Sequence, residues 1–386
     1  MKNVLWARPA DARYAHELKE FPRQLVFIMG CHRSGTSMLY HLPAYTGACE
    51  YISAYDIIKY DEIVRNRTEG REESVKAELD AAIRVEKNRG LDNLPVGTEY
   101  PEEYRFLLAP KAPRWFLSIR KRVEKLLFAP HLTRETRERF LEICRKKQFL
   151  AGGDRPLVLK NPNDYYFNFG EIHRMFPQAK MIFIHRHPLH ILNSYVAGFG
   201  GVVKSKNAYL ALIDPMYRDL FRSPIRRKIF QSAFRGEQLP TYLVSGLVRS
   251  YEYYMEKIRL IPEDRFLAVR YEDLCRDPER HLSQIGKWLN IEIKPRIPEN
   301  FVAPRNLEVA DRVYLAYAQR VEEIRPYLAS QNYPLFPDSM PPRTDSTANC
   351  HLSHWLKRLK AIQNLVCSKL APCYIVSKRC KTFQNL

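Results

Sequence analysis

The sequence predicts an α/β fold with three layers, in which helices cover both faces of a central parallel sheet. Three stretches lead to this prediction. Residues 25–42 have the pattern of a buried strand, a loop with two glycines and a helix. Residues 155–195 alternate strand and helix twice, and residues 265–291 add a further apolar strand and an amphipathic helix. Because a helical segment separates successive strands, the strands are expected to run parallel.

The stretch LVFIMGCHRSGTSML, from Leu25 to Leu39, organises the rest of the chain. Its first five residues are all apolar, which indicates a strand buried on both faces. The segment from Gly30 to Ser37 then carries small and hydroxyl residues, and apolar residues recur afterwards at helical spacing. A loop between a strand and a helix N-terminus directs backbone N–H groups to a point where the helix dipole is positive. The stretch therefore predicts a binding site for phosphate or sulfate.

This loop differs from the nucleotide-triphosphate loop G-x-x-x-x-G-K-[ST] at one position that matters. It keeps Gly30, Gly35 and Ser37, but Thr36 stands where that loop has its lysine. The nearest cation is Arg33, which could stabilise an anionic leaving group. Without the lysine, ordinary hydrolysis of ATP or GTP is disfavoured. A degenerate kinase acting on a nucleotide or small molecule is kept as an alternative.

The pattern G-x-x-R-S-G-T-S resembles the 5′-phosphosulfate loop of sulfotransferases that use PAPS, 3′-phosphoadenosine 5′-phosphosulfate. His32 stands where many members have proline. The resemblance implies a P-loop-like sulfotransferase fold with helical insertions, and PAPS as the sulfuryl donor. It also implies that the 5′ end of the donor is held by Arg33, Ser34, Gly35, Thr36 and Ser37.

A second candidate phosphate site follows the strand predicted at Lys180 to His185. Arg186 ends this strand and Ser194 follows eight residues later. Ligands of open α/β sheets gather at the carboxyl ends of strands, and a guanidinium can bind phosphate in bidentate fashion. The spacing resembles that of the arginine and serine that hold the 3′-phosphate in sulfotransferases. Two such sites, each after a buried strand, favour a sulfotransferase.

Candidate catalytic residues follow the strand at 157–159. Lys160, in L-K-N-P, resembles a family cation at the rim of the site that stabilises charge on the sulfuryl group. Asp164 occupies the place where many relatives have histidine, so it is the predicted general base, provided that its pKa is raised or the acceptor hydroxyl is activated. Glu50 and Asp56 are rival bases, although their segment is more typical of an exposed polar turn.

Two further segments resemble parts of the same family. R-Y-E-D-L at 270–274 is similar to the segment that closes the nucleotide pocket, which implies that Tyr271 contacts the nucleotide, whereas Glu272 and Asp273 are expected to brace the backbone. A proline and two acids at 101–103 resemble the start of a helix in the bacterial-type sulfotransferase-3 group.

The resemblance covers most of the chain. We expect an N-terminal extension at 1–20, a sulfotransferase domain at 21–335, and a proline-containing linker with a basic tail at 336–386. Four of the eight cysteines lie in this tail, whose role the sequence does not specify.

Several segments outside the motifs are expected to be helical. Residues 115–127 and 132–150 predict basic helices that cap the acceptor site, and 204–240 is interpreted as an acceptor-side insertion. Residues 72–87 predict a charged helix whose carboxylates face solvent. None of these segments identifies the acceptor, which could be a carbohydrate, small molecule, lipid or peptide.

The chain has 386 residues and a net charge of +19, which suits anionic ligands. A non-catalytic basic protein that binds polyanions or membranes is therefore a second alternative. Specific binding of nucleic acid is not expected, because no RNP-like or zinc-finger signature occurs. The basic tail could contact a membrane peripherally. We expect no metal site, and the absence of a long apolar run predicts a cytoplasmic protein.

Overall fold

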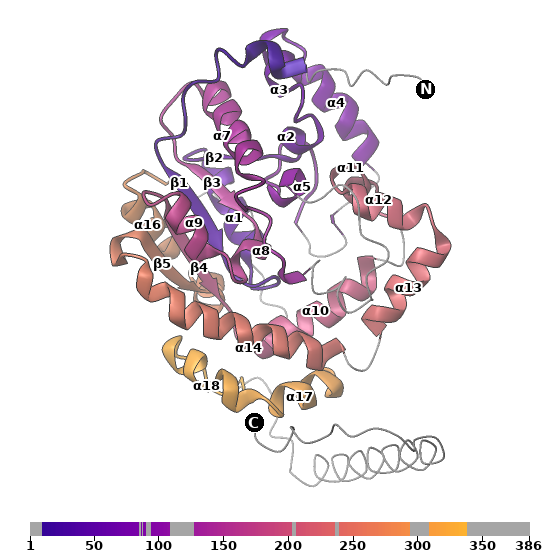
Figure 1. Cartoon of the computed structure of the whole chain (residues 1–386), viewed down its shortest axis with the longest axis vertical. Helices are drawn as coiled ribbons and strands as arrows, with labels where there is room; N and C mark the ends of the chain where they lie inside the picture. The colour runs from indigo at the N-terminus through magenta and orange to yellow at the C-terminus, as the bar shows by residue number, and fades with distance from the viewer. Residues whose placement is uncertain are drawn as a thin grey trace, which may run out of the picture. The chain divides into compact units, whose positions relative to one another are not determined.

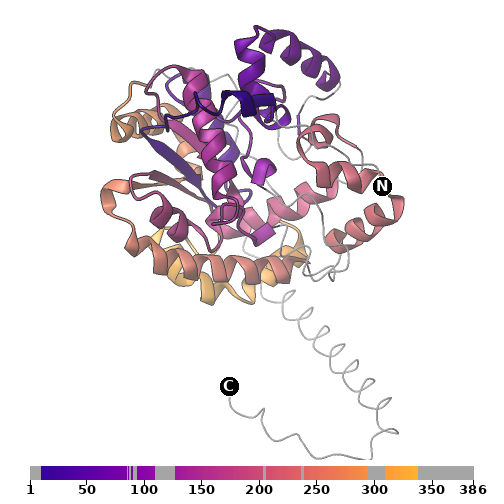
Figure 2. The ribbon, with the colours of Figure 1, turned by 45° about the horizontal axis from the view of Figure 1, so that its top comes forward.

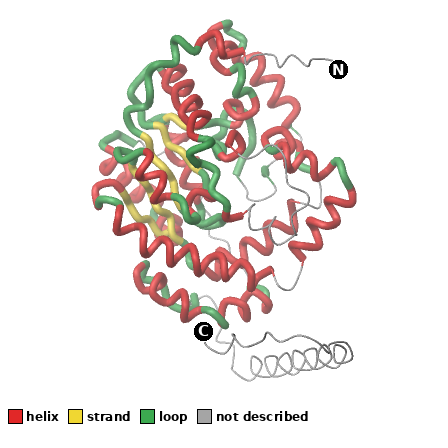
Figure 3. Tube along the Cα trace, viewed as in Figure 1, coloured by secondary structure: helices red, strands yellow, loops and turns green. Residues whose placement is uncertain are grey.

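Five parallel strands form one sheet in the order β2-β3-β1-β4-β5. The computed structural model describes residues 10–84, 86, 88–89, 94–108, 127–202, 206–235, 239–293 and 309–337. In sheet order, the strands span Glu50–Tyr51, Leu157–Lys160, Leu25–Met29, Lys180–His185 and Phe266–Arg270. Figure 3 shows these strands in yellow, with helices in red around them.

The predicted strands are confirmed, but β2 was not foreseen. Its two residues, Glu50 and Tyr51, pair with the edge of β3. The exposed polar turn expected around Asp56 is wrong, because α2 (Ala54–Ile58) buries four of its five residues. Asp56 and Tyr55 are polar but buried, because Asp56 pairs with Lys147 and the Tyr55 hydroxyl accepts a hydrogen bond from Asn66.

One face of the sheet packs against α1 (Thr36–Thr46) and α16 (Pro278–Leu289). Alternate strand residues point to this side. They form one buried cluster with apolar side chains of the two helices; its strand members are Val26, Ile28, Val158, Ile182, Ile184 and Val269.

The opposite face is aromatic. The ring centroid of Phe27 lies 6.0 Å from that of Phe140 on α7 (Arg137–Ala151). The ring centroid of Phe183 lies 5.4 Å from that of Tyr254 on α14 (Leu239–Lys257). It also lies 5.1 Å from the ring centroid of Phe169, the first residue of α9 (Phe169–Met175). With helices on both faces, the predicted three-layer α/β/α architecture is confirmed (Figure 1).

The remaining helices connect and extend these layers. Two lie along α14 in both Figure 1 and Figure 2: the yellow-orange helices α17 and α18. The bounds are α3 Ile63–Thr68, α4 Glu72–Ile83, α5 Arg105–Leu108, α8 Pro162–Tyr165, α10 Pro188–Val202, α11 Ala208–Ile213, α12 Pro215–Phe221, α13 Pro224–Arg235, α15 Tyr271–Arg276, α17 Asp311–Ala318 and α18 Val321–Ser330.

Two predicted boundaries differ from the structure, and a third predicted helix is not tested. The helix expected from Pro101 begins at Arg105, because Pro101 is held in a bridge with Ser53. The acidic turn expected at 271–273 is the first turn of α15. The helix expected at 115–127 lies outside the described residues except for its last residue.

Asp11, in the predicted N-terminal extension, is held by contacts with α3 and α7. Near the N-terminus, the buried Asp11 accepts hydrogen bonds from the backbone N–H groups of Val64 and Arg65 and pairs with Lys146 at 3.0 Å. Contacts along the chain divide it into residues 1–335 and 336–386.

Among the described helices, none is both long enough and apolar enough to cross a bilayer.

The last residue of β4, His185, joins the sheet to two helices. Its Nδ1 lies 2.9 Å from the hydroxyl of Tyr327 on α18, and its ring centroid lies 4.9 Å from that of Tyr254 on α14. The side chain is almost fully buried. Burial lowers the pKa of His185 from 6.5 to about 3, so the folded protein holds this imidazole neutral.

His185 should therefore make the protein less stable in acid. In the unfolded chain an imidazole takes up a proton near pH 6.5, whereas in the folded state it does so only near pH 3, so its contribution is complete above pH 6.5 and is lost as the pH falls toward 3. One such group changes the free energy of unfolding by up to about 1.4 kcal/mol per pH unit. Urea denaturation between pH 7 and pH 4.5 should show a shallower pH dependence for His185→Gln than for the unchanged protein.

The matched control is His16→Gln, since the side chain of His16 is 74% exposed. This variant should keep the pH dependence of the unchanged protein. If His185→Gln also keeps it, the account of a buried neutral imidazole is wrong.

Candidate active site

The carboxyl ends of four strands meet at one edge of the sheet, because the strands are parallel. Ile28 pairs with Lys160, Met29 with Phe183, and His185 with Arg270. This register brings the loop after β1, the end of β3, and the residues after β4 and β5 to the same edge. Sequence-distant candidate residues are thereby brought together.

The loop after β1 needs its two glycines. A Cβ atom on Gly30 would lie closer than 3.0 Å to the carbonyl oxygen of Ile184 and to Ser34 Oγ. Gly35 has φ of +100°, and a Cβ there would clash with the ring of Tyr271. The loop therefore packs tightly against β4 and the start of α15.

Arg33 connects the loop to the end of β4. It has φ of 69°, a left-handed conformation that is uncommon for a residue other than glycine. Its backbone carbonyl accepts a hydrogen bond from Arg186 at 2.8 Å, and its Nε donates to Ser194 Oγ at 3.0 Å. The two phosphate sites predicted from separate motifs are thus in direct contact.

Tyr271 completes this junction. The guanidinium carbon of Arg186 lies 4.4 Å from the centroid of the Tyr271 ring, a cation–π arrangement. The same ring fills the space above Gly35. Tyr271 thus contacts both the loop and Arg186.

Two buried polar atoms at the junction lack hydrogen-bond partners within the described part of the chain: Ser34 Oγ and Arg186 Nε. Most buried polar groups in proteins are satisfied, so each such atom needs an explanation. A hydroxyl and a guanidinium N–H are both suitable donors to phosphate oxygens. Thr36, also buried, begins the 11-residue helix α1, whose N-terminus favours an anion.

Glu272, next to Tyr271, braces the site as the sequence predicted. Its carboxylate accepts hydrogen bonds from the backbone N–H of His187 at 3.2 Å and from the hydroxyl of Tyr333 at 2.6 Å. Burial alone would raise the pKa of Glu272, but these donors and the nearby His190 lower it to about 2. Glu272 is therefore ionised, and it fixes the start of α10 relative to α15.

Lys160 is buried, with 2% of its side chain exposed, and does not lie at the rim as predicted. Its Nζ donates to Ser37 Oγ at 2.8 Å and also pairs with Glu103. Burial lowers the pKa of Lys160, and Glu103 opposes this effect. Lys160 therefore joins the anion loop to a carboxylate that sequence reasoning did not assign to the site.

Glu103 lies between two cations. It pairs with Lys160 and, at 2.8 Å, with Nε of Arg105. Burial acts to raise the pKa of Glu103, but the charges of Lys160 and Arg105 outweigh it and hold the pKa below its ordinary value. The sequence signal that could have assigned Glu103 to the site is the proline and two acids at 101–103, which the sequence analysis treats only as the start of a helix.

His32 lies in the loop next to Arg33. Its backbone N–H donates to the hydroxyl of Tyr166 at 2.9 Å, and its ring stacks on Tyr166 with centroids 5.7 Å apart. Burial lowers the pKa of His32 to about 3, so the ring is neutral. His32, at the position where many members have proline, thus packs against Tyr166, directly after α8, and adds no charge to the site.

Asp164, the predicted base, is saturated with donors. Its side chain is fully buried, and both oxygens accept hydrogen bonds. The five donors are Tyr104 Oη, Asn161 Nδ2, Asn168 Nδ2 and the backbone N–H groups of His131 and Leu132. This carboxylate ties three segments together, and the geometry gives no support to its predicted role as base.

The rival carboxylates are also engaged in local structure. Glu50 pairs with Arg155 at the edge of the sheet. Asp56 accepts the backbone N–H of Ser53 in a capping box at the start of α2 and pairs with Lys147 at 2.8 Å. Each has a structural partner that accounts for its position.

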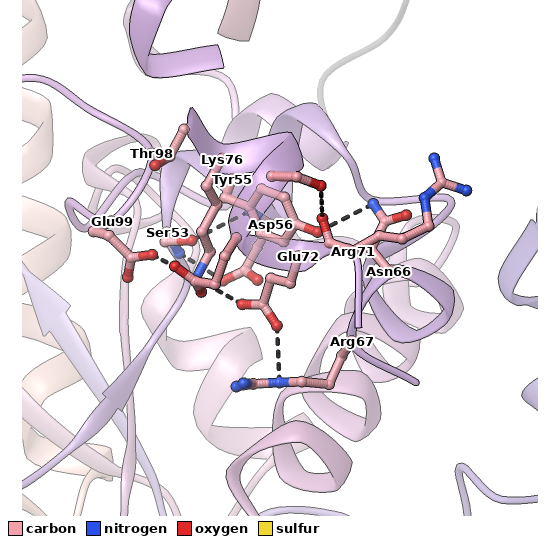
Figure 4. A network of polar contacts seen from close by, with 12 residues as sticks. Ser53, Tyr55, Asp56, Asn66, Arg67, Arg71, Glu72, Lys76, Thr98 and Glu99 are labelled. Carbon is pink, nitrogen blue, oxygen red and sulfur yellow. Dashed lines mark hydrogen bonds and ion pairs between the residues drawn. The ribbon is translucent and has the colours of Figure 1, made fainter. Parts of the chain in front are cut away.

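The charged helix α4 is not simply solvated, as the sequence suggested. Glu72 is largely buried and pairs with Arg67 at 2.8 Å and with Lys76 at 2.6 Å. Lys76 also pairs with Glu99 and lies 5.3 Å from the ring centroid of Tyr55. Figure 4 shows this polar network, which fixes α4 against α2 and α3.

A family model described as "Sulfotransferase family" matches residues 25–295. The omega-hydroxy-beta-dihydromenaquinone-9 sulfotransferases Stf3 of Mycobacterium bovis and Mycobacterium tuberculosis are each 25% identical over 280 residues. That alignment covers 69% of this chain and 62% of each relative, so the chain spans less than two thirds of their length.

The fold is also shared with a solved structure. Sulfotransferase STF9 from Mycobacterium avium superposes with a TM-score of 0.54 at 16% identity, covering 83% of this chain and 80% of that chain. This similarity concerns the fold alone. The match to the family model covers all four strand ends of the site, from β1 to β5. The chain therefore belongs to the sulfotransferase family.

Proposed function

We propose that this protein transfers a sulfuryl group from PAPS to a hydroxyl or amine of an acceptor, leaving 3′-phosphoadenosine 5′-phosphate (PAP). The observation that carries the proposal is the contact between the loop and the end of β4. Arg186 donates to the carbonyl of Arg33, and Arg33 donates to Ser194. PAPS has anionic groups on both the 3′ and 5′ oxygens of one ribose, and two adjoining anion sites suit such a molecule.

Each group of the donor has candidate partners in the chain. In this proposal the 5′ phosphosulfate lies on Ser34, Gly35, Thr36 and Ser37 at the N-terminus of α1. Arg186 and Ser194 hold the 3′-phosphate, and Tyr271 contacts the nucleoside. The unpartnered Ser34 Oγ and Arg186 Nε support this assignment, because anion oxygens would satisfy both.

Two cations of the site are suited to the transfer step. PAPS supplies a sulfuryl group attached to a phosphate leaving group. Arg33 and Lys160 stabilise the negative charge on the oxygens of the sulfuryl group during its transfer. Lys160 is already held next to the loop by its hydrogen bond to Ser37. Because its charge is buried, its effect on a bound anion is stronger than at an exposed position.

The proton of the acceptor needs a base, and Glu103 is the carboxylate that contacts Lys160. Both of its oxygens are paired with cations, Lys160 and Arg105, and one of these cations is proposed to act on the transferred group, whereas Asp164 is held by five hydrogen-bond donors. As Lys160 turns toward the transferred group, the pKa of Glu103 rises because its strongest neighbouring charge withdraws. Glu103 then takes the acceptor proton while the new O–S bond forms and the bond from sulfur to the phosphate oxygen breaks.

The Stf3 relatives suggest a class of acceptor. Their name specifies an omega-hydroxylated dihydromenaquinone, a lipid alcohol. A lipid alcohol is therefore the first acceptor to test. A screen with labelled PAPS across lipids, phenols, carbohydrates and peptides would identify it. Nothing favours the kinase alternative, since the loop has Thr36 in place of lysine.

Discrimination between PAP and AMP tests the 3′-phosphate site. The unchanged protein should bind PAP at least tenfold more tightly than AMP in isothermal titration calorimetry. Arg186→Ala should remove most of this preference, because a hydrogen bond to a charged group contributes about 1.5–3 kcal/mol. Ser194→Ala should weaken the preference less, because a neutral hydroxyl contributes less to binding a phosphate than a charged guanidinium does.

The control is Arg259→Ala, which removes an exposed arginine elsewhere and should keep the preference. Equal affinity of the unchanged protein for PAP and AMP would contradict the roles given to Arg186 and Ser194.

Lys160→Met tests the transfer step. We expect kcat to fall about 100-fold or more, the range seen when a preorganised electrostatic group is removed. Affinity for PAP should change less than fivefold. Glu103→Gln should also reduce kcat with little effect on PAP binding. Turnover is measured as PAP release with the best acceptor from the screen.

Folding is controlled with the double variant Lys160→Met and Glu103→Gln, which removes both charges of the Lys160–Glu103 ion pair together. It should be as inactive as Lys160→Met but bind PAP. Normal kcat in Lys160→Met would rule out the catalytic role of Lys160.

A further inference from the structure

One face of the helix α13 is exposed and includes two isoleucines that are not buried against the domain. Pro224, Ile225, Lys228, Ile229 and Ser232 are exposed and recur at spacings of three and four residues, so they lie on one face. Ile225 is 72% exposed and Ile229 is 38% exposed. Isolated exposed apolar residues are common, but two on adjacent turns of one helix form a continuous apolar contact surface.

Basic residues surround these isoleucines. From Arg218 to Arg235 the chain has six lysines and arginines and one acid, Asp219. The side chain of Arg222, just before the helix, is 71% exposed, and Lys228 is exposed between the two isoleucines. Asp219 pairs with Arg222 at 3.2 Å, so the surplus charge is positive. A helix with apolar side chains flanked by bases is typical of attachment to an anionic bilayer surface.

The position of α13 relates this face to the active site. α13 contacts α10, the helix that carries Ser194, and lies at the outer edge of the domain in Figure 1. The preceding segment begins with α11, whose Tyr209 donates to Glu102 at 2.7 Å, one residue before Glu103. The segment from α11 to α13 therefore connects Glu102, the neighbour of the candidate catalytic carboxylate, to the exposed basic face.

We propose that the exposed face of α13, with Arg222 before it, docks on a membrane of anionic phospholipid. Ile225 and Ile229 enter the boundary between headgroups and acyl chains, while Lys228 and Arg222 lie against lipid phosphates. This docking does not depend on the proposed reaction, although it would place the acceptor side of the domain at the bilayer.

Two other occupants fit the face less well. A soluble polyanion would use the bases but would leave both isoleucines in water. A second copy of this chain would set one basic face against another, and like charges across an interface oppose association. An anionic bilayer matches both the charge and the apolar pair.

Vesicle sedimentation with the full chain tests the proposal. The probes are vesicles of phosphatidylcholine alone and vesicles in which about a third of the lipid is phosphatidylglycerol. The unchanged protein should sediment with the anionic vesicles at least tenfold more strongly than with the neutral ones. The double variant Ile225→Gln and Ile229→Gln, which keeps the net charge, should lose at least tenfold in partition coefficient. The double variant Arg222→Gln and Lys228→Gln should lose severalfold.

The matched control is Leu260→Gln, because Leu260 is 65% exposed on a different element, residues 258–260. It should sediment like the unchanged protein, and thermal melting should show that all variants fold. The basic C-terminal residues are present in every variant, so binding through them would leave the isoleucine variant unaffected. That result, equal binding to neutral vesicles, or no binding by the unchanged protein would each overturn the proposal.

Discussion

The hydrogen bonds around Arg33 are the constraint on which the rest of the site depends. A left-handed backbone at this residue lets its carbonyl accept from Arg186 while its side chain donates to Ser194. Such a conformation costs free energy in a residue with a Cβ, so it must be compensated by the contacts that it allows. The contacts connect the loop after β1 to the end of β4, and they join the two candidate anion sites into one surface.

The sheet explains why so much of this arrangement could be predicted from the sequence. Apolar strands and intervening helices predicted parallel strands, and parallel strands bring their carboxyl ends to one edge. Arg186 could therefore be assigned to the site from its position after a strand, and Lys160 from the resemblance of L-K-N-P to the family segment. Tyr271 was assigned through its motif, and its packing above Gly35 agrees with that position. The edge strand β2 was missed because two residues carry no periodic signal.

Side-chain partners were much harder to predict than positions. Asp164 followed a strand, as a catalytic residue would, but nothing in the sequence indicated that five donors converge on it. Glu103 belongs to a loop between elements, and its proximity to Lys160 depends on how 94–108 folds over the sheet edge. Sequence spacing fixes local geometry, whereas pairs such as Glu103 and Lys160, 57 residues apart, depend on tertiary packing.

The central claim is that one nucleotide spans the loop at 30–37 and the end of β4. A crystal structure of the protein with PAP bound tests it most directly. The account predicts one PAP molecule, with its 5′-phosphate on the backbone N–H groups of the loop and its 3′-phosphate on Arg186 and Ser194. A 3′-phosphate lying away from Arg186, or a nucleotide bound at another edge of the sheet, would contradict the account.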